Sequence, residues 1–249
     1  MKILTMIPSM SANSNPYLPK VLKELKDISD VYVFAPEKIE MDGVNTQLSD
    51  PNLKHALTFE HRRMVVDLID EYDYFLYNED DILITRETLE YAIEVNEKIS
   101  KDDPQNNVQF LRYEVENGVE EFVDLAPYNS VHRGGNGVSD IIQKLHMIDG
   151  DYYFIPYNLH SGNWLLSKYQ VKVLMHNNVF HTNAEARYCG VLESAASDIK
   201  MNLRMLSPTV DYKKLMVHHM PNKYVFNPVK VSTQLLDNFF SFIPEDVAL

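Results

Sequence analysis

The sequence YDYFLYNEDDILIT, residues 72–85, predicts the centre of the fold. Its first half is a run of aromatic and aliphatic residues, which stops at the three consecutive acids Glu79, Asp80 and Asp81 before the chain turns apolar again. A continuous apolar run of this kind is typical of a strand that is buried on both faces of a parallel sheet. In open α/β sheets, ligands collect just beyond the carboxyl ends of such strands. The three acids are therefore expected at a ligand site.

Three adjacent carboxylates repel one another unless a cation lies among them. A Mg²⁺ or Mn²⁺ ion held by one or two carboxylates and by substrate phosphates meets this need. A solvated acidic turn is the alternative interpretation of a motif this short. The position of the acids directly after a buried strand favours the metal site.

Composition sets the class of protein. The chain has 249 residues, of which 45% are hydrophobic and 24% charged, as in an ordinary soluble globular protein. Its formal net charge of −13 argues against nucleic acids and anionic membrane surfaces as general partners. Cys189 is the single cysteine, which excludes an intramolecular disulfide and favours a reducing compartment. We expect a cytoplasmic protein without a transmembrane segment. Peripheral association with a membrane is left open as an alternative.

Strands and helices alternate over the first hundred residues, which predicts an α/β fold with a mostly parallel sheet. The expected elements are strands over residues 2–7 and 31–35, a helix that begins after Asn15, a helix over residues 57–71 and a helix capped by Thr85.

The middle of the chain changes character. Asn117-Gly118, between apolar runs, is the strongest short signal for a hairpin and predicts a small antiparallel insertion. The glycine-rich residues 132–137 lack the strand-to-helix context of a dinucleotide-binding loop. The later expected elements are strands over 108–115, 119–125, 151–156, 160–166 and 214–217, a helix that begins with a capping box at Ser167, and helices over 184–202 and 231–242. We expect one domain over residues 1–249, with a C-terminal extension from about residue 221.

In this order of elements, the chain resembles the nucleotide-sugar-dependent glycosyltransferases of the GT-A fold over roughly residues 1–220. Three features carry the resemblance: the DxD-type motif Glu79-Asp80-Asp81, a strand that starts at Gly162 and leads into a capped helix, and a helix bearing Glu193 that precedes a late His-containing strand. The resemblance implies a Rossmann-like, mostly parallel sheet with flanking helices and a small antiparallel hairpin. It also implies transfer of a sugar from a UDP- or GDP-sugar to a carbohydrate or glycoconjugate acceptor.

The resemblance further implies a metal site. By this resemblance, Asp81 is expected to ligate Mn²⁺ or Mg²⁺, and Glu79 is expected to reach the metal through a water molecule. Asp80 is expected to contact ribose or sugar hydroxyls. His218 and His219 offer a second ligand, and imidazole favours Mn²⁺. Adjacent residues of a strand face opposite ways, so one of the two is expected at the metal and the choice stays open. A hydrogen-bonded histidine near the surface is the alternative for either.

An inverting transfer, which we expect, needs a carboxylate that deprotonates the acceptor hydroxyl. Glu193 is the first candidate by its place in the chain, with Asp198 and Glu185 behind it. A solvated helix face is the alternative for each of them. A retaining transfer needs no such base, and the sequence leaves the stereochemistry open.

Further residues are expected around the donor and acceptor. Pro8 and Ser9 follow the first strand and would border the nucleotide, and Arg62 would meet the diphosphate. Trp164 would offer its ring face to a sugar. A core position for Trp164 and an exposed helix face for Arg62 are the alternatives.

Two other functions stay open. A metal-dependent nucleotidyltransferase also places acids and a metal at a strand end, but it typically has a glycine-rich loop after its first strand, and PSMSANSNP, residues 8–16, contains no glycine. A non-catalytic protein that binds nucleotides or sugars with the same fold is the second alternative.

Overall fold

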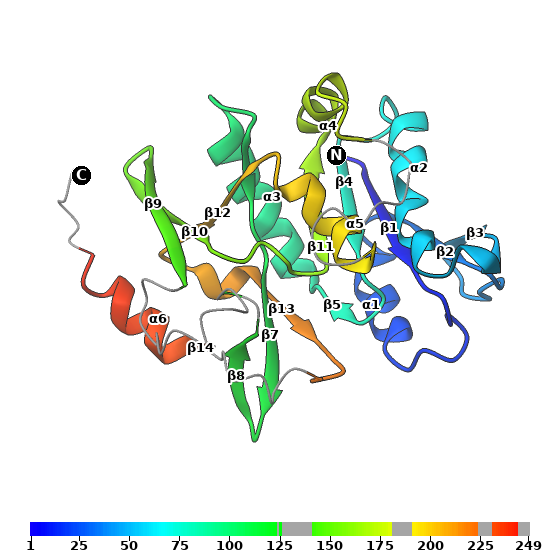
Figure 1. The fold of residues 1–249 in the computed structure, drawn as a ribbon, viewed down its shortest axis with the longest axis horizontal. Helices are drawn as coiled ribbons and strands as arrows, with labels where there is room; N and C mark the ends of the chain where they lie inside the picture. The colour runs from blue at the N-terminus through cyan, green and yellow to red at the C-terminus, as the bar shows by residue number, and fades with distance from the viewer. Residues whose placement is uncertain (124, 126–140, 181–190, 224–230, 244–249) are drawn as a thin grey trace.

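The computed structural model describes residues 1–123, 125, 141–180, 191–223 and 231–243 (Figure 1). The glycine-rich residues 132–137 and the candidate base Glu185 lie outside the described residues.

The central sheet has five strands in the order β11-β4-β1-β2-β3 (Figure 1). Strands β1 (Ile3–Pro8), β2 (Asp30–Ala35), β3 (Val44–Leu48) and β4 (Tyr74–Asn78) run parallel, and β11 (Asn163–Ser167) pairs with β4 antiparallel. The α/β fold class with a mostly parallel central sheet is therefore confirmed.

Both faces of this sheet are covered, which explains the continuous apolar character of its strands. Ile3 and Ile7 of β1 belong to one buried apolar cluster, and Leu4 and Met6 belong to a second cluster on the other face. Helices α1 (Leu18–Leu25) and α3 (Arg86–Ser100) supply the first cluster, and η1 (Pro51–Phe59), α2 (His61–Asp67), α4 (Lys168–His176) and α5 (Val191–Lys200) supply the second.

Two smaller sheets extend the molecule beside the central one. The first has the order β6-β12-β10-β9 and the second the order β14-β8-β7-β13-β5. Their strands, with the two remaining helical elements, are β5 (Ile82–Leu83), β6 (Asn106–Val108), β7 (Leu111–Glu116), β8 (Val119–Phe122), β9 (Ile142–Ile148), β10 (Asp151–Pro156), β12 (Arg204–Pro208), β13 (Met216–His219), β14 (Val231–Ser232), η4 (Tyr212–Leu215) and α6 (Thr233–Phe240).

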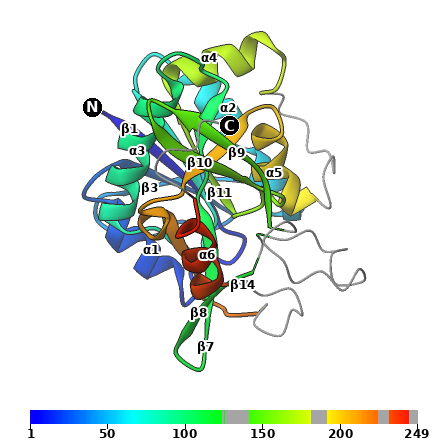
Figure 2. The ribbon, with the colours of Figure 1, turned by 90° about the vertical axis from the view of Figure 1, so that its left-hand side faces the viewer.

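The expected local signals are confirmed at three places. Asn117 and Gly118 have φ values of 50° and 80°, as a tight hairpin turn requires, and the β7–β8 hairpin projects from the body of the molecule (Figure 2). Thr85 caps α3 through a hydrogen bond from the backbone N–H of Thr88. Ser167 caps α4 in a complete capping box.

Other predicted boundaries are wrong. The expected helix over residues 57–71 is divided between η1 and α2, and α2 ends at Asp67 because the backbone of its cap residue Leu68 is not helical, with φ of −109° and ψ of 14°. The strand expected over 108–115 is divided between two sheets as β6 and β7, and residues 212–215 form η4 before β13 begins. Strands β3, β9 and β12 were not expected, and β3 and β9 are partly exposed edge strands.

A buried ion pair joins α2 to α5. Arg62 is 0% exposed and its Nη2 donates to Oδ1 of Asp198 and, at 3.2 Å, to the carbonyl oxygen of Ala195. The ring of Phe59 lies 4.4 Å from the guanidinium carbon. Sequence analysis placed Arg62 at the diphosphate and Asp198 among the candidate bases, but the structure pairs the two side chains with each other in the interior.

We expect Asp198→Asn to lower the free energy of unfolding by about 3–5 kcal/mol, because it leaves the Arg62 charge buried without its carboxylate. Urea unfolding measures the change. Asp67→Asn is the matched control, since Asp67 and Arg63 form an exposed ion pair at 3.7 Å on α2. Equal, small effects of both substitutions would show that the buried pair contributes nothing to stability.

Candidate functional site at the ends of β1 and β4

A cavity of about 460 Å³ opens at the carboxyl ends of β1 and β4. Residues of the loop after β1 and of the acidic turn after β4 both line it. Among the lining residues are all three acids of the turn, with Arg112, His160, Glu193, His219 and Lys223 around them. The ligand site that the sequence predicts beyond these strands therefore coincides with a real cavity.

The acidic turn is held by backbone and amide hydrogen bonds. Asn78, the last residue of β4, donates through Nδ2 to the carbonyl oxygens of Glu79 at 2.9 Å and Ile82 at 2.8 Å. The backbone N–H of Glu79 donates to the carbonyl oxygen of Gly162 at 2.9 Å. Gly162 has φ of 68°, and a Cβ there would lie 2.6 Å from Oε2 of Glu79. A glycine is thus required at this position both by the backbone and by the Glu79 carboxylate.

The three acids point to different partners. Ser9 donates through Oγ to Oδ2 of Asp80 at 2.5 Å, whereas Oδ2 of Asp81 lies 3.4 Å from Nε2 of His219. Glu79 packs beside Gly162. The turn therefore distributes its carboxylates between the β1 side of the cavity and the β13 side.

Burial shapes the protonation of the turn. Burial raises the pKa of Glu79 to about 7 against the charge of Arg112, and the charges of Asp81 and Asp80 raise it further. Burial also raises the pKa of Asp80, although the hydrogen bond from Ser9 opposes it. For Asp81, burial is outweighed by the neighbouring His219, which holds the pKa of the carboxyl below its ordinary value. Crowded, desolvated carboxylates of this kind are what a cation would stabilise.

Positively charged groups share the cavity with these acids. Arg112 is buried and Lys223 is exposed at its edge. Burial, with the charges of Arg112 and Lys200, holds the pKa of His160 well below its usual range, so this imidazole is neutral at pH 7. The cavity thus offers oxygen ligands to a cation and cationic side chains to an anion.

The side chain of His219 lies between the carboxyl groups of Glu114 and Asp81. It is 3% exposed, and its Nδ1 lies 2.5 Å from Oε1 of Glu114 while Nε2 faces Asp81. The residues come from three adjacent strands or strand ends, because β13 pairs with β7 on one side and with β5 on the other.

The other candidates occupy different places. His218 points away from the cavity, stacks on Tyr113 with ring centroids 5.0 Å apart, and has Nε2 3.3 Å from Oδ1 of Asn222. Trp164 is fully buried against Tyr77 at 5.9 Å between ring centroids, in the core position that was its alternative.

Pro8 and Glu193 line the cavity, and Ser9 reaches it through Asp80. Arg112, Glu114 and His160 were not singled out by sequence analysis. The sequence does contain a signal for Arg112 and Glu114. The two charged residues stand at alternate positions of a strand, which places them on the same face of the sheet.

The donor set fits a divalent cation with few protein ligands. Within the described ranges, no group of three or more His, Cys, Asp and Glu side chains is arranged to hold a metal ion. Mg²⁺ and Mn²⁺ bound beside phosphates need only one or two protein carboxylates, since water and phosphate oxygens complete the shell. Asp81 and His219, with their donor atoms 3.4 Å apart and Glu79 nearby, meet that smaller requirement.

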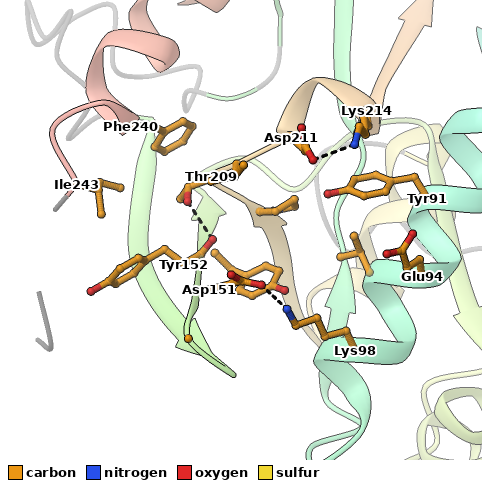
Figure 3. Close-up of a pocket in the computed structure, with 15 residues that line it drawn as sticks. Tyr91, Glu94, Lys98, Asp151, Tyr152, Thr209, Asp211, Lys214, Phe240 and Ile243 are labelled. Atoms are coloured by element: carbon orange, nitrogen blue, oxygen red, sulfur yellow. Dashed lines mark hydrogen bonds and ion pairs between the residues drawn. The ribbon is translucent and has the colours of Figure 1, made fainter. Parts of the chain in front are cut away.

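A second cavity, of about 510 Å³, lies between α3, β10 and α6 (Figure 3). Four of the charged residues that line it form two ion pairs, Lys98 with Asp151 and Lys214 with Asp211 at 2.8 Å. Because it lies away from the ends of β1 and β4 and has no cluster of acids, we assign the chemistry to the first cavity.

Comparison with known proteins leaves the family open. No protein-family model matches the chain. A probable nicotinate-nucleotide adenylyltransferase of Clostridium beijerinckii is 28% identical over 152 residues, which cover 56% of this chain and 69% of that protein. The crystal structure of a glycosyltransferase involved in the glycosylation of the major capsid of PBCV-1 covers 97% of this chain and 100% of its own, with a TM-score of 0.42 and 13% identity. Neither similarity assigns the chain to a family. In the part of the chain that the structure describes, no helix is long and apolar enough to cross a membrane.

The raised pKa of Glu79 gives a testable pH dependence. The folded protein holds a proton on Glu79 up to about pH 7, whereas the unfolded chain releases it above about pH 4.5. This carboxyl therefore lowers the free energy of unfolding as the pH rises through that window. We expect Glu79→Gln to become progressively more stable than the parent protein across the same window, measured by urea unfolding in EDTA. A difference in free energy that stays constant with pH would contradict this assignment.

Proposed function

We propose that the protein is a metal-dependent glycosyltransferase that moves a sugar from a nucleotide-sugar donor, a UDP- or GDP-sugar, to a carbohydrate or glycoconjugate acceptor. The observation that carries the proposal is the placement of Glu79, Asp80 and Asp81 at the carboxyl end of β4, in the lining of a cavity that Arg112 and Lys223 also line. Such a site combines ligands for a divalent cation with positive charge for a diphosphate.

The size and the walls of the cavity suit the donor. Its volume of about 460 Å³ falls within the range of small-molecule sites. Pro8 and Ser9 would border the nucleotide, as the GT-A resemblance implies. Asp80, fixed by the hydroxyl of Ser9, would accept hydrogen bonds from ribose or sugar hydroxyls.

Transfer of the sugar leaves negative charge on the departing diphosphate. Asp81 and His219 would hold the cation, with Glu79 behind a water molecule, and the bound cation would neutralise that charge as a Lewis acid. Arg112 and Lys223 would oppose the same charge from the protein side. The donor and the leaving group are thereby bound by residues from four separate segments of the chain.

Glu193 would act as the base in an inverting transfer. Outside the acidic turn, it is the one carboxylate among the described residues that line the cavity. Asp198, the other candidate on α5, is engaged with Arg62 and does not line it. Glu193 would take the proton of the acceptor hydroxyl as the new glycosidic bond forms.

A nucleotidyltransferase is the second candidate, favoured by the similarity to the adenylyltransferase of Clostridium beijerinckii. The glycine-free loop after β1 argues against it. The products distinguish the two reactions: a glycosyltransferase releases a nucleoside diphosphate from a sugar nucleotide, whereas an adenylyltransferase releases pyrophosphate from ATP. Cation-dependent nucleotide binding without either product would indicate a non-catalytic binding protein.

We expect Asp81→Asn to weaken cation-dependent nucleotide binding by about 100-fold or more, because even residues behind a metal ligand contribute ~10–100-fold to metal affinity. Calorimetric titration of UDP and GDP with Mn²⁺ measures the loss. Asp151→Asn, in the second cavity, is the matched control and should bind as the parent does. Unchanged affinity of Asp81→Asn would remove the metal site from the proposal.

We expect Glu193→Gln to lower kcat by about 100-fold or more while donor affinity is retained, because a general base contributes ~10²–10⁴-fold and Gln removes only that function. Release of nucleoside diphosphate in the presence of an acceptor measures kcat. Glu94→Gln, in the second cavity, controls for the loss of a surface charge. Full activity of Glu193→Gln would reassign the base or indicate a retaining transfer.

A further inference from the structure

The strand order of the second small sheet places Glu114, His219 and Asp81 in one row. Parallel pairing of β13 with β7 sets His218 opposite Tyr113, so His219 lies beside Glu114. Antiparallel pairing of β13 with β5 sets His219 opposite Ile82, the residue after Asp81. A hydrogen bond of 3.0 Å from the backbone N–H of Met220 to the carbonyl oxygen of Asp81 connects the end of β13 to the acidic turn.

The environment of the His219 imidazole differs at its two nitrogens. On one side, Nδ1 lies 2.5 Å from Oε1 of Glu114, whose side chain is 0% exposed. On the other side, Nε2 lies 3.4 Å from Oδ2 of Asp81, a residue that lines the cavity. Because an ionised carboxylate only accepts hydrogen bonds, this short contact requires the proton on Nδ1 when Glu114 is ionised. Nε2 is then the ring nitrogen that faces the cavity.

Burying the carboxylate of Glu114 costs free energy, and a protein with an apolar residue of similar volume in such a position is often as stable or more stable. Its contact with His219 gives it a specific task. A histidine that ligates a metal almost always donates its other ring N–H to a carboxylate, a carbonyl or water, which fixes the ring and its tautomer.

We propose that Glu114 is a positioning residue that holds His219 with Nε2 directed at the cation beside Asp81. This inference rests on the proposed metal-dependent function. The separation of 3.4 Å between Nε2 and Oδ2 supports it, since two neighbouring ligands of one octahedral Mg²⁺ or Mn²⁺ lie about 3 Å apart. Glu114 itself would touch neither the cation nor the substrate.

The test begins with the unsubstituted protein. Nitrogen-15 NMR of the histidine rings, with the His219 signals identified by their loss in His219→Asn, should show Nδ1 protonated and Nε2 unprotonated at neutral pH. Addition of Mg²⁺ with UDP or GDP should then shift the Nε2 resonance. A doubly protonated ring would overturn the inference, because His219 would then be a cation shared by Glu114 and Asp81.

Glu114→Gln tests the role of the carboxylate directly. We expect the affinity for Mn²⁺, measured by electron paramagnetic resonance, to fall ~10–100-fold, and the Nδ1 tautomer to lose its dominance. Glu120→Gln, an exposed glutamate of the same hairpin, is the matched control and should bind Mn²⁺ as the parent does. Unchanged Mn²⁺ affinity in a folded Glu114→Gln would overturn the inference.

The inference and the proposed function can fail separately. Cation binding that depends on Glu114, without turnover of any sugar nucleotide, would support the positioning role and reject the transferase. Turnover of Glu114→Gln that needs more Mn²⁺ than the parent protein and recovers at saturating Mn²⁺ would support the positioning role. Turnover lost at every Mn²⁺ concentration, or turnover with an unchanged Mn²⁺ requirement, would contradict it.

Discussion

The site depends on one electrostatic constraint, the confinement of three carboxylates to a single turn at the end of a buried strand. The turn cannot spread apart, because Asn78 holds two of its carbonyl oxygens and the backbone of Gly162 holds Glu79. Burial therefore raises the pKa of Glu79 to about 7. A cation bound among these groups would relieve the repulsion between the carboxylates. The proposed metal dependence therefore follows from the way the fold confines the turn.

The remaining residues of the site reach this turn through two different sheets. The central parallel sheet brings the loop after β1 to the acids, where Ser9 fixes Asp80. The sheet of β7, β13 and β5 brings Glu114 and His219 to Asp81. Asp80 and Asp81 are thus oriented by partners from two different sheets, which gives the turn a nucleotide side and a metal side in the proposed reaction.

The sequence predicted the elements whose signals are local. The run before Glu79 is apolar because β4 is buried on both faces, and the caps at Thr85 and Ser167 involve residues three positions apart. Edge strand β3, with its polar sequence, gave no such signal.

Long-range pairings could not be predicted in the same way. Arg62 meets Asp198 from 136 residues away, and Glu114 meets His219 from 105 residues away. Which acid faces the cavity and which is paired in the core is decided by these contacts. Sequence analysis therefore located the acidic turn and ranked Glu193 before Asp198, but it could not show that Asp198 is paired with Arg62 in the interior.

The most direct test of the central claim is the thermal stability of the protein with UDP, GDP, CMP or dTDP, each with Mn²⁺, Mg²⁺ or EDTA. A ligand that binds only the folded state raises the melting temperature. Our account predicts a rise with one of these nucleotides that requires the cation, and the absence of a rise under every condition would contradict it.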